Sequence, residues 1–91
     1  MKEVIAPSYK IFTWNRMKPL GLCDWENREI FINEKAHKNK PVEMLDTLVH
    51  EEAHAVYPEF NEREVAGLVA EMLPTLTHPQ IVAYFNLYYG N

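Results

Sequence analysis

Residues 47–55 of this 91-residue chain read TLVHEEAHA, and they contain two histidines and a glutamate in the order H-E-x-x-H. His50 and His54 are four positions apart, so on a helix they lie one above the other. Imidazoles at that spacing can both bind one Zn²⁺ at roughly 2.0–2.1 Å, and the glutamate between them projects beside the metal. The stretch therefore predicts a zinc site with His50 and His54 as ligands, and Glu51 as the general base that takes a proton from water.

The pattern around the motif predicts a helix over residues 42–57. Pro41 suits a first helical turn, and Pro58 ends the pattern. On a helical wheel the two histidines leave the main apolar stripe together, which favours a binding site over a buried core position. The alternative is a pair of surface histidines on an amphipathic helix. The stripe itself comprises Val42, Leu45, Val49, Ala53 and Val56.

A catalytic zinc takes three protein ligands and keeps one position for water, so a third ligand is expected downstream. A second helix is predicted over residues 62–73, where Asn61 caps the helix and Glu64 completes a capping box. Glu62 lies nearer to the apolar side of this helix than Glu64 does, so we expect Glu62 to be the ligand. Glu64 is the second choice. The full set of candidates is Glu59, Glu62, Glu64, Glu71 and His78.

The first third of the chain predicts strands. Aromatic and β-branched residues at 9–14, the segment 22–25 and the alternating run 29–33 favour a short three-stranded sheet that is mostly antiparallel. The mixed charges of residues 33–40 predict a solvated loop that includes His37. Cys23 is expected to face the interior from its strand.

The whole chain predicts a single α+β domain over residues 1–91, with strands followed by three helices. The predicted elements are strands within 9–33, the motif helix 42–57, the glutamate helix 62–73 and a C-terminal helix 77–89.

Composition excludes several classes of function. Hydrophobic residues make up 47% and charged residues 24% of the chain, which is typical of a globular domain. The net charge of −4 argues against nucleic acid as a partner, and no apolar run approaches the roughly 20 residues of a membrane helix. With Cys23 as the sole cysteine and no apolar signal-peptide core at the start, we expect the cytoplasm.

The sequence resembles the minimal gluzincins, which are very small thermolysin-like zinc metallopeptidases. The resemblance covers roughly residues 9–73 and is carried by four stretches, LGLCD (20–24), REIFIN (28–33), TLVHEEAHA (47–55) and NEREVA (61–66).

This resemblance implies zinc held by His50, His54 and Glu62, with Glu51 as base, and a protein or peptide as substrate. It also implies that strand 29–33 borders the cleft and adds a substrate strand to its edge. The C-terminal helix either covers the core or, as in some members of the family, occupies the cleft and keeps the enzyme latent.

Two other functions remain open from the sequence. One is a non-catalytic binding module stabilised by zinc, and the other is a zinc hydrolase that acts on a substrate other than a peptide. The family often steadies the oxyanion with a tyrosine or histidine, but no motif selects one here. The candidates are Tyr57, His78, Tyr84, Tyr88 and Tyr89.

Overall fold

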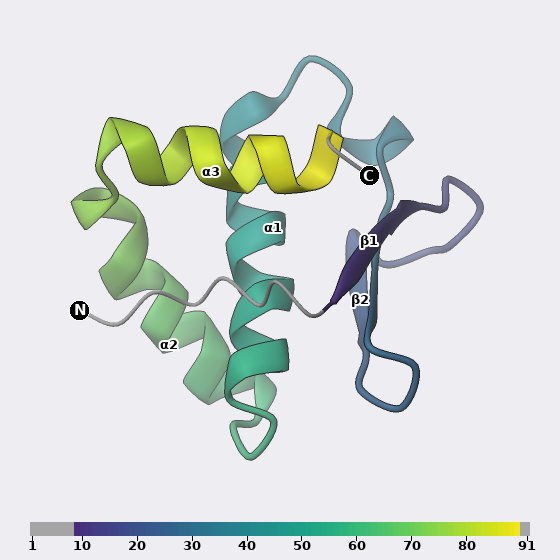
Figure 1. The fold of residues 1–91 in the computed structure, drawn as a ribbon, viewed down its shortest axis with the longest axis horizontal. Helices are drawn as coiled ribbons and strands as arrows, with labels where there is room; N and C mark the ends of the chain where they lie inside the picture. The colour runs from purple at the N-terminus through teal and green to yellow at the C-terminus, as the bar shows by residue number, and fades with distance from the viewer. Residues whose placement is uncertain (1–8, 90–91) are drawn as a thin grey trace.

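A computed structural model describes residues 9–89 and confirms the predicted α+β class. Three strands come first and three helices follow, as Figure 1 shows. In chain order the elements are β1 (Lys10–Thr13), β2 (Gly21–Asp24), β3 (Glu29–Ile32), the 3₁₀ turn η1 (Lys35–His37), α1 (Pro41–Val56), α2 (Glu62–Met72), the 3₁₀ turn η2 (Leu73–Thr75) and α3 (His78–Tyr89).

The sheet is mixed, with strand order β1-β3-β2. β2 pairs with β3 antiparallel, as predicted, but β1 pairs with β3 in parallel, so the expectation of a mostly antiparallel sheet is wrong for that pair. The chain reverses once between β1 and β2 and again between β2 and β3, so β1 and β3 run the same way. Ile30 and Ile32 on the central strand are fully buried. Ile11 and Cys23, which flank Ile30 in the register, also face the core.

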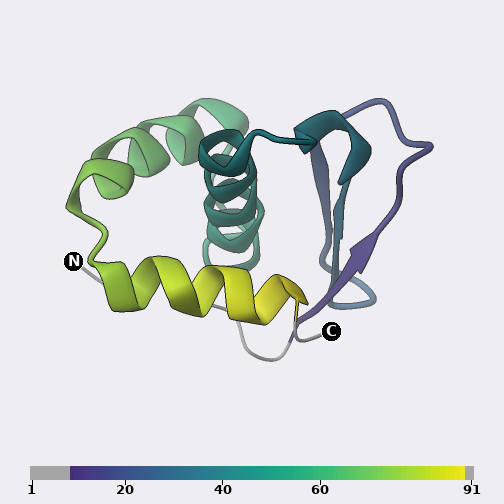
Figure 2. The same ribbon diagram turned by 90° about the horizontal axis from the view of Figure 1, so that it is seen from above.

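Helix α1 lies between the sheet and α2, and α3 crosses it (Figures 1 and 2). It packs against β2 on one side and against α2 and α3 on the other. The buried face is therefore broader than the predicted stripe, and it includes Leu48, Glu51 and Glu52. Val42 is 74% exposed, so its assignment to the stripe is wrong, and in the first turn of α1 it is Met44 that is buried.

The segment 33–40 is not simply a solvated loop. Its lysines are exposed, but His37 is 3% exposed. The His37 Nδ1–H donates to the Asn33 carbonyl (2.7 Å), since a carbonyl can only accept, and Nε2 shares a hydrogen bond with the Thr47 hydroxyl (2.8 Å). The 3₁₀ turn directs His37 inward and the charges outward, and it ties the segment to α1.

Helix α2 begins with the predicted capping box. The Glu64 N–H donates to the Asn61 side-chain oxygen (2.8 Å), and the Asn61 N–H donates to the Glu64 carboxylate (3.0 Å). The helix packs through buried Val65, Val69 and Met72.

Helix α3 begins at His78, as predicted, and buries Tyr84 and Tyr88. It lies across α1 and reaches β1 (Figure 2), and it thereby closes the core. Within residues 9–89, no helix is both long enough and apolar enough to cross a membrane.

Candidate metal centre

His50 and His54 lie one turn apart on α1 and point to the same place. Their Nε2 atoms are 3.2 Å apart, and their rings meet edge to face. His54 is 6% exposed, whereas His50 is half-buried. Both imidazoles therefore present one nitrogen to a common point at the end of α1.

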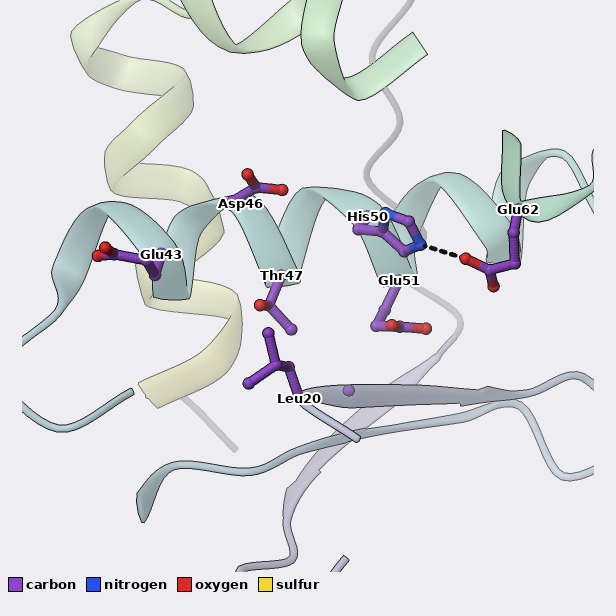
Figure 3. Close-up of a pocket in the computed structure, with 8 residues that line it drawn as sticks. Leu20, Glu43, Asp46, Thr47, His50, Glu51 and Glu62 are labelled. Carbon is purple, nitrogen blue, oxygen red and sulfur yellow. Dashed lines mark hydrogen bonds and ion pairs between the residues drawn. The ribbon is translucent and has the colours of Figure 1, made fainter. Parts of the chain in front are cut away.

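Glu62 completes the cluster from the first residue of α2. Its Oε2 lies 3.0 Å from His50 Nε2, and its Oε1 lies 2.7 Å from His54 Nε2 (Figure 3 shows the contact with His50). The structure thus brings Glu62, and not the capping Glu64, to the imidazoles. The reason given from the sequence is wrong, because the Glu62 side chain is 78% exposed and does not pack in the core. It reaches the histidines because the start of α2 lies beside the end of α1.

The electrostatics of Glu62 fit a ligand carboxylate. Partial burial raises its pKa, but the hydrogen bond to His50 and the positive charges of His54 and His50 outweigh this and lower the pKa overall. An ionised carboxylate beside two imidazoles is the donor set that zinc takes in hydrolytic sites.

The spacing of the donor atoms also fits zinc. Ligands about 2.0–2.1 Å from a tetrahedral ion are about 3.3 Å from one another. The nitrogen–nitrogen distance is 3.2 Å, and the nitrogen–oxygen distances are 3.0 and 2.7 Å. These separations are at or below the tetrahedral value, and the three side chains lie close enough together to hold one metal ion.

Glu51 lies next to this cluster and points between α1 and β2 (Figure 3). It is 7% exposed, and no hydrogen bond or ion pair joins its carboxylate to residues 9–89. Burial, together with the negative charge of Glu62, raises the pKa of Glu51 to about 7. A carboxylate with a pKa near neutrality is suited to exchange protons with a reacting group.

Gly21 on β2 makes room for Glu51, a role that no pattern in the sequence indicated. A Cβ atom at position 21 would lie 2.8 Å from the Glu51 Cγ and 2.8 Å from the Thr47 Cγ2. Real Cβ atoms essentially never come so close to another atom. The glycine therefore allows the strand backbone to approach the carboxylate.

Trp25 supports His54 from the turn after β2, and the sequence did not predict this either. Its indole N–H donates to the His54 carbonyl (2.7 Å), one of the last carbonyls of α1, which lack partners within the helix. The two rings also meet edge to face at 6.0 Å. The Nδ1 atom of His54 finds no hydrogen-bond partner within the described range 9–89, so Trp25 supplies the contact that orients this ring.

Two pockets flank the cluster along β2. One, of about 370 Å³, is bounded by Leu20, Gly21 and Thr47 and runs toward the start of α1. The other, of about 150 Å³, extends past Leu22 and Trp25. Gly21, Glu51 and Glu62 line both pockets.

No residue of α3 lines either pocket. The described part of α3 packs on α1 and β1, which supports the prediction that this helix covers the core and does not support the alternative that it occupies the cleft. Five residues are candidates for oxyanion stabilisation from the sequence, and none of them lines these pockets. They are Tyr57, His78, Tyr84, Tyr88 and Tyr89.

The expectation that strand 29–33 offers its edge to a substrate strand is wrong. β3 has β1 on one edge and β2 on the other, so the segment 29–33 has no edge for a substrate strand. β1 and β2 are the edge strands among the described residues, and β2 is the one that packs against α1 beside the cluster.

Comparison with known proteins found no family model, no curated protein and no solved structure that matches this chain.

Proposed function

We propose that this chain is a zinc-dependent peptidase of the gluzincin type. His50, His54 and Glu62 hold the ion, and Glu51 acts as general base. The observation that carries the proposal is the convergence of three donors next to a buried carboxylate that has no protein partner within residues 9–89.

Zinc, when bound, supplies a Lewis acid that polarises the scissile carbonyl and acidifies the attacking water. Glu51 takes the proton of that water as its oxygen attacks the carbonyl carbon. It then passes the proton to the amine nitrogen as the C–N bond breaks. In the metal-free chain burial and Glu62 raise the pKa of Glu51 to about 7, and a cation bound beside it would lower that pKa and favour the ionised form that acts as base.

The edge of β2 is the place we propose for the substrate backbone. Its outer edge pairs with no strand among the described residues, and the two pockets follow it on either side of Glu51. A peptide added to a sheet edge gains affinity through backbone hydrogen bonds, and the pockets can then accept its side chains.

A zinc-stabilised module without catalysis is the competing function. Such a module gains nothing from Glu51, because burying a carboxylate without a hydrogen-bond partner lowers stability. The burial of Glu51 therefore favours hydrolysis. The single cysteine, Cys23, is the basis for proposing the cytoplasm as the compartment.

Metal analysis joined to a cleavage assay tests the proposal. We expect the purified chain to bind one zinc ion, and we expect the zinc-loaded protein to cleave an unfolded protein such as reduced casein. His54→Ala should lose both properties. A wild-type protein that takes up no zinc, or that takes it up and cleaves no peptide bond, would rule the proposed function out.

Gly21→Ala is expected to keep zinc bound but to lower kcat/KM by roughly 100-fold, the order of loss that follows from displacing a catalytic group by about 1 Å. The added methyl meets Glu51 and Thr47, and the Glu51 side chain must move. Zinc content and peptide hydrolysis measure the two effects.

Gly67→Ala is the matched control, because a Cβ at position 67 has no atom within 4 Å. This variant should keep full activity and gain about 0.5–1 kcal/mol of helix stability. Full activity in Gly21→Ala would show that the close approach of β2 does not position Glu51.

A further inference from the structure

The larger of the two pockets has a strongly acidic lining. Four of its eight lining residues carry carboxylates, and no lysine or arginine among residues 9–89 lines it. Glu62 belongs to the metal centre and Glu51 to the catalytic machinery proposed above. The other two, Glu43 and Asp46, lie on the first half of α1, away from Glu62 (Figure 3).

Glu43 and Asp46 are exposed, and neither makes a hydrogen bond or an ion pair with the part of the chain that the structure describes. Glu51 lines the same pocket and is 7% exposed. Its carboxylate has no hydrogen-bond partner within residues 9–89. Three carboxylates therefore lie around one cavity, and His50 is the one basic side chain among residues 9–89 that lines it. This arrangement points to a cationic occupant.

We infer that this pocket receives a lysine or arginine side chain of the substrate, close to the bond that is cleaved. The inference rests on the proposed peptidase function and specifies its substrate class. Leu20 and the methyl group of Thr47 offer an apolar wall for the methylene stem of the side chain. Asp46 and Glu43 accept the charged hydrogen bonds of its head group.

The spacing along α1 sets the position of the basic residue. Asp46 is four residues and Glu43 seven residues before His50, which places them roughly 6 and 10 Å from it along the helix axis. An extended peptide advances about 3.3 Å per residue. The basic side chain therefore lies within about three residues of the cleaved bond, and on one side of it only.

A set of matched peptides tests this inference. Unstructured peptides of one length carry lysine, glutamine or glutamate at one variable position, and kcat/KM is measured with the zinc-loaded protein. We expect the lysine peptide to be cleaved roughly tenfold faster than its glutamine twin, with the cut at a fixed distance from the lysine. The glutamate peptide should be the slowest.

The double variant Glu43→Gln/Asp46→Asn should reduce the lysine preference to near unity while the glutamine peptide is cleaved as before. Replacing both residues by lysine should reverse the preference toward glutamate. Glu71→Gln, an exposed position on α2 outside the pocket, is the matched control and should keep the preference. Equal cleavage of the three peptides by the wild type, or a double variant that keeps the preference, overturns the inference.

A binding measurement separates failure of this inference from failure of the proposed function. If no peptide is cleaved, the peptidase proposal fails, and the labelled peptides are titrated into the zinc-loaded Glu51→Gln protein by fluorescence anisotropy. Tighter binding of the lysine peptide, abolished in the Glu43→Gln/Asp46→Asn background, supports the pocket. Equal binding of the lysine and glutamine peptides overturns it.

Discussion

Replacement of Glu51 by glutamine is expected to lower peptide hydrolysis by roughly 1,000-fold while one zinc ion per chain is retained. The amide keeps the size and shape of the side chain, but it cannot accept the proton of the attacking water. General-base catalysis is worth about 10²–10⁴ in rate, and the loss should therefore fall in kcat. Zinc content by mass spectrometry and kcat from a peptide assay measure the two properties separately.

Glu59→Gln is the matched control, because Glu59 is exposed in the turn between α1 and α2 and lines neither pocket of the centre. It should keep both zinc and activity. If Glu51→Gln cleaves peptides as fast as the wild type, Glu51 is not the base. If neither protein cleaves any peptide but both bind zinc, the non-catalytic module becomes the better account of the centre.

Removal of zinc by a chelator is expected to lower the melting temperature by about 15 °C or more. A ligand present at 1,000 times its Kd stabilises the folded state by about 4 kcal/mol, and each kcal/mol shifts the melting temperature of a chain of this size by about 4–8 °C. An ion held by His50, His54 and Glu62 would join α1 to α2, so its removal would eliminate a cross-link between the two helices. Differential scanning fluorimetry with and without EDTA measures the shift.

Two variants on α2 identify the ligand in the same measurement. Glu62→Gln should melt at a lower temperature than the wild type in zinc and respond weakly to EDTA. Glu64→Gln should respond as fully as the wild type, because glutamine preserves the capping box and Glu64 lies outside the donor cluster. A full EDTA response in Glu62→Gln, or none in the wild type, would contradict the assignment of the third ligand.

The sequence was most informative where structure depends on local spacing. The i, i+4 relation of His50 and His54 on one helix follows from helical geometry alone. The assignment of Glu64 as the capping residue likewise follows from its position three residues after Asn61. Glu62 was expected to be the ligand because it lay nearer to the apolar side of the helix, but it reaches the histidines from an exposed position.

The sequence was least informative where residues meet across long separations. The parallel pairing of β1 with β3 depends on which edge of β3 the hairpin leaves open, and local pattern does not encode that choice. His37 looked solvated because its neighbours are charged, but a 3₁₀ turn directs it inward to Thr47. The roles of Gly21 and Trp25 come from contacts with α1 that no short motif contains.

All three donors of the centre lie on one helix–turn–helix segment, and His50 and Glu62 are twelve positions apart in the chain. Closing so short a loop has a low entropic cost, so the segment can assemble before the slower, long-range pairing of β1 with β3. A cation captured at that stage ties the two helices together in the folding transition state, and it then acts mainly on the rate of folding rather than on the rate of unfolding. A chain that captures a cation in this way would form the helical hairpin before the sheet is completed.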